Sequence, residues 1–289
     1  MVPTIQNILF PVDFSRSCAA MAAYVKRAAA ILGAKVTLAH VFDLTSHNGF
    51  ELYVRPLSEI AEEHQELARG ELDSYLTSEF PVAECPRILL SGDVATEIAQ
   101  LARTRAFDLI VMPTYAGSFR RMLLGSTTAK VLNDADCPVM TTQHAQEAVP
   151  RPMEHREWLC AIGLDANSEA TLRYASCLAA AARAKLTLIH AIPRVDPNLR
   201  TQLGPEEQVE CAELGEARRR LDELRRQAGS EAPVRIAVGP VKEALLQEVR
   251  RSDADVLVIG RNPQSRAGGR MRDLTYAMVC DSPCPVASV

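Results

Sequence analysis

Short apolar runs alternate with longer amphipathic stretches along the first half of the chain. The runs are rich in β-branched residues and almost free of charge, which is typical of strands covered on both faces. They span residues 8–12, 36–41, 87–90, 109–112 and 139–142. This pattern predicts five buried strands, and the sequence between them has room for a helix after each of the first four.

The stretches between the runs carry helical periodicity and end signals. Ser15 or Ser17 can cap an alanine-rich helix that runs to about Leu32, where Gly33 ends it. Residues 57–76 place apolar side chains near the 3.6-residue period, with glutamates on the other side. These apolar positions are Leu57, Ile60, His64, Leu67, Leu72 and Leu76. Two further helices are expected, one capped by Asp93 and one over residues 126–132.

Five strands separated by four helices predict an α/β fold with an open parallel sheet. Right-handed crossovers then place helices on both faces of the sheet. In such sheets, ligands bind at the carboxyl ends of the strands where neighbouring crossovers leave in opposite directions. We therefore expect the functional residues in the loops that follow the first and fourth strands.

The second half of the chain repeats the first, element by element. The matched segments are 12–13 with 164–165, 35–41 with 185–191, 91–94 with 238–241, 108–112 with 255–259 and 137–139 with 284–286. This alignment makes Asp165 the counterpart of Asp13. We predict two domains of one fold, residues 1–146 and 155–289, joined by a linker near residues 143–157.

Composition narrows the class of protein. The 289 residues are 47% hydrophobic and 24% charged, with a net charge of −4, so a globular protein is expected and a polybasic nucleic-acid binder is not. No apolar run is long enough to span a membrane and no export signal opens the chain, which favours the cytoplasm. The eight cysteines form no CxxC pair, so they are expected to be buried thiols rather than metal ligands.

The loop after the fourth strand has the residues of an anion site. Gly125 allows a ligand to approach the backbone, and Ser126 and Thr127 place hydroxyls and amides at the start of a helix. A phosphate is the natural occupant. An ordinary Gly-Ser helix cap is the alternative.

Three segments together resemble the universal stress proteins, and the resemblance covers both copies. They are Asp13 after the first strand, the Gly125-Ser126-Thr127 turn and the closing Ala135-Asp-Cys-Pro-Val139. The resemblance implies the strand order 3-2-1-4-5 in each copy and ATP as ligand, with or without Mg²⁺. It also implies that the two domains pair through their last strands as a pseudo-dimer. A homodimer of the whole chain is left open.

Residue by residue, the resemblance places Asp13 as an acceptor beside the adenosine, Val41 against the base, and the Gly125 turn on the phosphates. The nucleotide-binding residues that it implies are Pro11, Val12, Asp13, Val41, Met112, Thr114, Gly117, Gly125, Ser126 and Thr127.

The first copy departs from the family pattern at two loop positions. Pro113 and Ala116 stand where the family has glycines, and proline has no amide to donate. Arg120 and Arg121 could add positive charge near the phosphates or simply be solvated.

The second copy departs further. Arg272-Asp273-Leu274 replaces the Gly-Ser-Thr turn, and an acidic side chain there repels phosphate. We therefore expect the second domain not to bind nucleotide in the usual manner. Its arginine-rich loop, residues 261–272, could recognise another anion or be solvated.

Three functions remain open. The first is a stress-response protein that binds ATP in its first domain, with at most slow hydrolysis. The second is a nucleotide-independent interaction protein. The third is an enzyme that acts on an adenylated or phosphorylated substrate, which has the least support because Asp13 is the one identifiable general base. His40 and His190 hold matching strand positions and are interpreted as structural.

Overall fold

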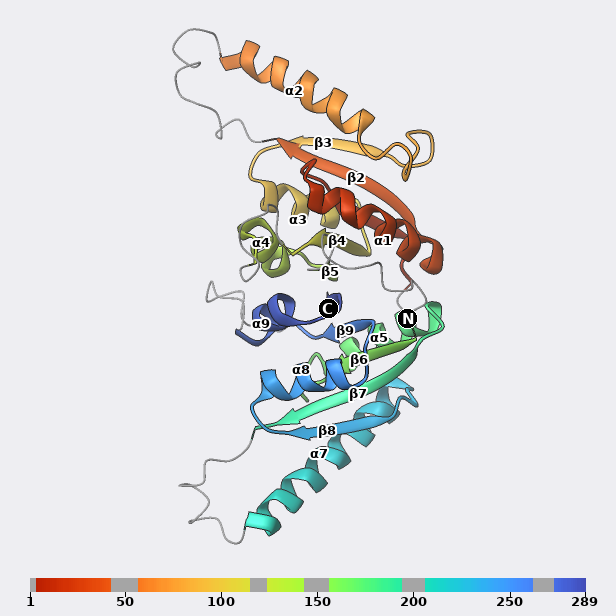
Figure 1. The fold of residues 1–289 in the computed structure, drawn as a ribbon, viewed down its shortest axis with the longest axis vertical. Helices are drawn as coiled ribbons and strands as arrows, with labels where there is room; N and C mark the ends of the chain where they lie inside the picture. Colours follow the sequence, from red (N-terminus) through yellow and green to blue (C-terminus); the bar gives the residue numbers. More distant parts are fainter. Residues whose placement is uncertain (1–3, 43–56, 115–123, 143–155, 194–205, 262–272) are drawn as a thin grey trace. The chain divides into compact units, whose positions relative to one another are not determined.

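The computed structural model describes residues 4–42, 57–114, 124–142, 156–193, 206–261 and 273–289 (Figure 1). The chain divides into an N-terminal unit, Ile5–Met153, and a C-terminal unit, Glu154–Val289. No helix within the described ranges is long and apolar enough to cross a membrane.

The N-terminal unit is a parallel α/β sheet. Its elements are β1 (Asn7–Pro11), α1 (Arg16–Leu32), β2 (Lys35–Phe42), α2 (Leu57–Ser74), β3 (Arg87–Ser91), α3 (Val94–Thr104), β4 (Leu109–Pro113), α4 (Ser126–Asp134) and β5 (Val139–Thr142). The strands pair in the order β3-β2-β1-β4-β5, and every pair is parallel. The predicted order 3-2-1-4-5 is confirmed for this unit.

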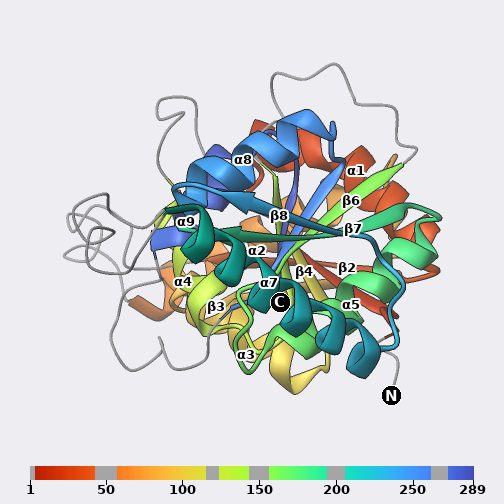
Figure 2. The same ribbon diagram turned by 90° about the horizontal axis from the view of Figure 1, so that it is seen from below.

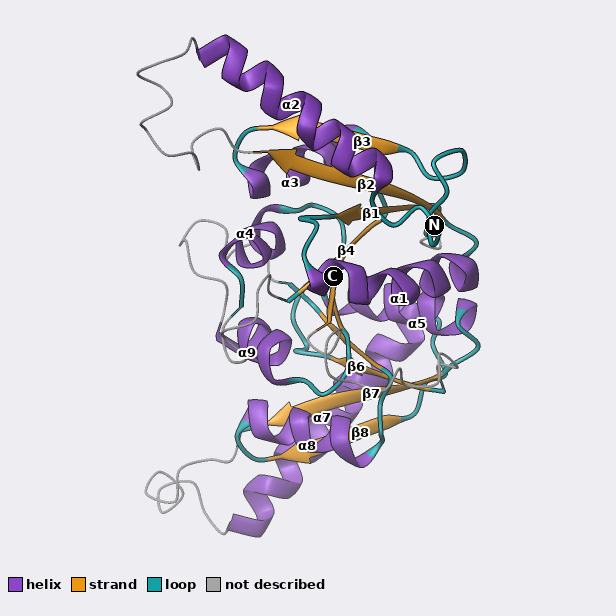
Figure 3. Cartoon of the chain, turned by 45° about the horizontal axis from the view of Figure 1, so that its top comes forward, coloured by secondary structure: helices purple, strands orange, loops and turns teal. Residues whose placement is uncertain are grey.

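Helices cover both faces of this sheet because the crossovers run in two directions from its middle. From β1 the chain moves through α1 to β2 and through α2 to β3, while α3 and α4 serve the return to β4 and β5. Figure 3 shows α2 lying along β2 and β3, against which it packs. The middle strand is accordingly deeply buried, with Ile8, Leu9 and Phe10 all at 0% exposure.

The ends of α1 follow the expected signals. The Ser15 side chain accepts a hydrogen bond from the Cys18 amide at 3.2 Å and is the N-cap. Gly33 ends the helix in the left-handed conformation, with φ of 65°.

The prediction that Leu67 belongs to the apolar side of α2 is wrong. Leu72 is fully buried, but Leu67 is 66% exposed, although both belong to the expected apolar stripe. Residues 61–71 are half-buried or exposed throughout. The core therefore receives the last turn of the helix rather than its whole length.

The C-terminal unit has the same architecture. Its elements are β6 (Glu157–Ala161), α5 (Ser168–Ala181), β7 (Lys185–Ile192), α7 (Glu206–Ala228), β8 (Val234–Val238), α8 (Val241–Arg251), β9 (Val256–Ile259), α9 (Asp273–Asp281) and β10 (Val286–Ser288). The order β8-β7-β6-β9-β10 repeats the first unit, again with parallel pairs. Figure 2 shows α8 on one side of these strands and α5 and α7 on the other. The duplicated fold is confirmed.

The structure corrects the alignment of Asp13 with Asp165. Phe14 and Leu164 occupy the same strained position after the first strand, with φ of 59° and 56°. Along the strand, Asp13 therefore corresponds to Gly163 and Asp165 to Ser15. Asp13 and Asp165 nevertheless each accept a hydrogen bond from the N-cap residue of the following helix, Ser15 and Asn167. The sequence alignment is two residues out because α5 begins later than α1 relative to this turn.

The burial of α2 predicts unequal effects of two leucine truncations. Leu72→Ala is expected to lower the free energy of unfolding by about 2–5 kcal/mol because it opens a cavity in a closed core. Leu67→Ala is expected to change it by no more than about 0.5 kcal/mol. Urea unfolding followed by circular dichroism measures both variants. Equal effects would contradict the observed burial.

Candidate functional site: the edge between the first and fourth strands

The candidate site of the N-terminal unit lies where β1 and β4 end side by side. Ile8 pairs with Leu109 and Leu9 with Ile110, so the two strands finish at the same edge of the sheet. The chain leaves β1 toward β2 and leaves β4 toward β5, in opposite directions. A ligand-binding crevice is therefore expected between the two loops that follow, at the switch point of the fold.

On the β1 side, Asp13 is held with its carboxylate at the surface. Its Oδ1 accepts a hydrogen bond from the Ser15 amide at 3.0 Å, which closes a tight turn. The side chain is otherwise exposed to solvent. Asp13 is thus fixed in direction by one oxygen and remains accessible as an acceptor.

Aromatic side chains support this turn, and the sequence pattern does not indicate this role for Phe14 or Tyr75. The Phe14 ring stacks on His40 with centroids 4.3 Å apart and meets Tyr75 edge-on at 5.2 Å. The Tyr75 hydroxyl donates to the Ser15 carbonyl at 3.1 Å. His40 Nδ1 lies 2.8 Å from the Val12 carbonyl oxygen, so the structural interpretation of this histidine is confirmed.

Two ionisable groups behind the turn keep their protons. Burial, and then the charge of Asp13, raises the pKa of the Cys18 thiol to about 12. Burial also raises the pKa of Tyr75, with smaller contributions from the charges of Cys18 and Asp13. Near neutral pH, neither group is a ready general base or nucleophile.

On the β4 side, two hydrogen bonds close the base of the loop. The Gly125 amide donates to the Thr114 carbonyl at 3.0 Å, and the Thr128 hydroxyl donates to the Pro113 carbonyl at 3.0 Å. The Gly125 amide is therefore already bonded. Gly125 itself has an extended conformation, with φ of −60°, that requires no glycine.

The start of α4 offers the polar groups that remain. Gly125 is its N-cap and supplies no capping side chain, and the first turn contains no acid. Ser126 is exposed and Thr127 half-buried. Thr114 is 1% exposed, and its hydroxyl has no hydrogen-bond partner among the described residues. The helix start therefore suits an anion.

The other predicted site residues are either buried at the ends of the strands or outside the described part of the chain. Pro11, Val12, Val41 and Met112 are all buried, at the ends of β1, β2 and β4. Gly117, Arg120 and Arg121 lie outside the described residues. The two sides of the predicted site thus follow neighbouring strands, with Asp13 after β1 and Thr114 and Gly125–Thr127 after β4.

At the matching switch point of the C-terminal unit, a side chain links the two loops. Asn167 Nδ2 donates to the Arg261 carbonyl at 2.8 Å and so joins the loops that follow β6 and β9. The Asp165 carboxylate accepts from the Ser168 hydroxyl at 3.0 Å and from the Asn167 amide at 3.1 Å. Its acceptor Oδ1 is used within its own turn.

The sequence matches one protein family over almost its whole length. The family model described as the universal stress protein family matches residues 4–143 and again residues 156–289. The chain belongs to the universal stress protein family. No curated protein is similar enough in sequence to be matched.

Solved structures agree on the fold of this universal stress protein. A universal stress protein from Archaeoglobus fulgidus is 20% identical, with a TM-score of 0.68 over 98% of this chain and 97% of that one. A protein of unknown function from Pseudomonas aeruginosa is 18% identical, with a TM-score of 0.64 over 100% and 93%. Both therefore share the tandem architecture along the full chain.

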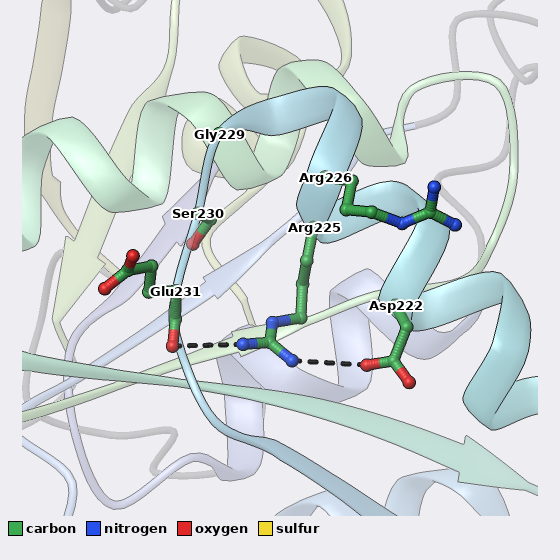
Figure 4. Close-up of a pocket in the computed structure, with 6 residues that line it drawn as sticks. All are labelled: Asp222, Arg225, Arg226, Gly229, Ser230 and Glu231. Atoms are coloured by element: carbon green, nitrogen blue, oxygen red, sulfur yellow. Dashed lines mark hydrogen bonds and ion pairs between the residues drawn. The ribbon is translucent and has the colours of Figure 1, made fainter.

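A surface pocket of about 420 Å³ in the C-terminal universal stress domain lies away from the crevice. It is lined by Asp222, Arg225, Arg226, Gly229, Ser230 and Glu231 (Figure 4). Arg225 donates to the Asp222 carboxylate and to the Glu231 carbonyl, both at 3.2 Å. Arg226 pairs with Glu223, and the side chains of Arg226 and Glu231 point away from each other. Arg225 thus ties the end of α7 to the next segment, and both arginines are paired with carboxylates.

Gly260 is expected to be required by close packing at the end of β9. A Cβ placed there would lie 2.8 Å from Thr171 Oγ1. Gly260→Ala should therefore cost about 1–3 kcal/mol of unfolding free energy. The cost should be smaller when Thr171 is already alanine, because the clashing atom is gone. Urea unfolding of both single variants and the double variant measures this coupling. Strict additivity would contradict the contact.

Cys18 is expected to resist alkylation. With a pKa near 12, only about one thiol in 10,000 is ionised at pH 8. Iodoacetamide labelling at pH 8, read by mass spectrometry, should be at least about 100-fold slower in the folded chain than in urea. The raised pKa also stabilises the fold below pH 9, and this contribution is lost as the pH rises toward 12. Equal labelling rates in both states would refute the assignment.

Proposed function

We propose that this universal stress protein binds ATP, with or without Mg²⁺, at the switch-point crevice of its N-terminal unit. The phosphates lie at the start of α4 and the adenosine lies beside Asp13 and Val41. Binding serves a stress response and involves at most slow hydrolysis. The observation that carries the proposal is the buried hydroxyl of Thr114, which has no partner among the described residues, next to an uncapped helix start.

The phosphate side rests on the electrostatics of a helix terminus. The first amides of α4 have no partner within the helix, and the helix dipole places partial positive charge there. An acid in the first turn would offset this charge, and α4 has none. Thr114 adds a hydroxyl that costs free energy to bury without a hydrogen bond, and a phosphate oxygen would supply one.

The adenosine side rests on the fixed direction of Asp13. A carboxylate that is held by the Ser15 amide and open to solvent can accept a hydrogen bond from a ribose hydroxyl. Cys18 and Tyr75 stay protonated behind it, which supports a binding role over rapid hydrolysis. The expected pairing of the two domains stays a prediction, as does a homodimer.

ATP binding is tested by calorimetric titration and thermal shift, with Ser126→Asp as the key variant. This substitution gives the N-terminal unit the acid that the C-terminal unit has at Asp273. Wild-type protein should bind ATP and melt at a higher temperature, by mass action on the folded state. Ser126→Asp should bind at least about 10-fold more weakly because its charge faces the phosphates.

The matched control places the same charge at the other end of the sheet. Thr104→Asp changes the exposed end of α3, from which the chain enters the amino end of β4. Its affinity for ATP should equal that of the wild type. Failure of the wild-type chain to bind millimolar ATP would remove the proposal, and so would equal losses in both variants.

The Thr114 hydroxyl is tested separately because its removal acts in opposite directions on binding and stability. Thr114→Val keeps the shape of the side chain and deletes the donor. Affinity for ATP should fall about 3- to 10-fold, while the chain without nucleotide should be as stable as wild type or more so. Unchanged affinity would exclude the hydroxyl from the site.

A nucleotide-independent interaction protein is the second candidate. It is favoured by the use of the Gly125 amide within the loop and by Pro113, which has no amide to give. A wild-type chain that does not bind ATP would support this function.

A further inference from the structure

Among the described residues, the two units satisfy the same backbone carbonyl with different donors. Thr114 and Arg261 are equivalent, since each donates its amide to a carbonyl at the end of the last strand of its unit, that of Thr142 or that of Val289 directly after β10. The Thr114 carbonyl accepts from Gly125, within its own loop. The Arg261 carbonyl accepts from Asn167, which belongs to the loop on the opposite side of the crevice.

The Asn167 side chain is available for this contact because it does not cap α5. Asn167 is the N-cap residue of that helix, but its side chain makes no capping hydrogen bond. Its backbone carbonyl already accepts from the Thr171 amide and from the Thr171 hydroxyl, each at 3.0 Å. The carboxamide is thus left to reach 94 residues along the sequence to Arg261.

The backbone next to this contact is packed too closely to admit a side chain. At Gly260, directly before Arg261, an added Cβ would meet Thr171 Oγ1 at 2.8 Å. The N-terminal unit has Pro113 at the equivalent position and therefore accommodates a ring there. The start of α5 thus lies directly against the end of β9, and Asn167 secures that approach.

We propose that Asn167 is a latch that holds the switch-point crevice of the C-terminal unit closed. Its carboxamide makes the link between the two loops that a bound ligand would otherwise make. The C-terminal unit then reaches its final local structure without any ligand.

One consequence rests on the proposed function: each chain binds a single nucleotide. In the N-terminal unit, Asp13 keeps an accessible carboxylate, α4 begins without a capping side chain, and the Thr114 hydroxyl has no partner among the described residues, whereas Asn167 links the two loops of the C-terminal unit. The tandem would thus combine a ligand-dependent domain with a ligand-independent copy of it.

The latch is tested by hydrogen exchange on the full chain without nucleotide. Asn167→Ala removes the donor, and amides around residues 162–168 and 259–261 should exchange about 2- to 10-fold faster than in wild type. Asn133→Ala is the control, because the Asn133 side chain bonds only to the neighbouring exposed Asp134 among the contacts described for it. It should leave exchange in both segments unchanged.

Asn167→Asp separates the latch from a simple helix cap. Aspartate has nearly the same shape and is favourable at a helix start, but at neutral pH it cannot donate to the Arg261 carbonyl. A latch therefore predicts faster exchange in this variant as well. Exchange equal to or slower than that of wild type, in either Asn167 variant, would overturn the proposal.

The number of ATP molecules bound per chain is an independent test of the latch. Calorimetric titration of the wild-type chain should give one ATP per chain. Two ATP molecules per chain would overturn the latch and leave the proposed function standing. Absence of binding would remove the proposed function, while the exchange experiment would still decide on the latch.

Discussion

The parallel pairing of the first strand with the fourth is the constraint on which both units depend. Ile8, Leu9 and Phe10 are fully buried, so β1 must be covered on both faces, and helices on both faces require crossovers that diverge from the middle of the sheet. The divergence leaves two loops at one edge with no helix between them. Every candidate functional group described above belongs to one of these loops or to the strand ends beneath them.

Within this shared framework, the units differ in a few polar groups. In the first unit, the loop after β4 is closed at its base by its own Gly125, and the Thr114 hydroxyl has no partner among the described residues. In the second unit, Asn167 crosses to Arg261 and links the loops directly. A duplicated fold can therefore carry different functions, since function depends on the loops that the sheet positions.

The elements of the fold could be predicted because buried parallel strands leave nearly unbroken apolar runs, and because Ser15 and Gly33 are strong local signals. The interactions between distant segments could not. Asp165 was aligned with Asp13 because both follow an apolar run, and a two-residue shift in a turn leaves no mark in hydrophobicity. The exposure of Leu67 depends on packing against distant segments, which helical periodicity does not encode. The link made by Asn167 spans 94 residues and has no local signature.

The central claim is that the first crevice is open to a nucleotide and the second is closed by the protein itself. A crystal structure of the full chain grown with a non-hydrolysable ATP analogue tests it most directly. The account predicts phosphate oxygens within hydrogen-bond distance of Thr114 and the first amides of α4, with Asn167 still bonded to Arg261. A nucleotide in the second crevice with Asn167 displaced, beside an empty first crevice, would contradict it.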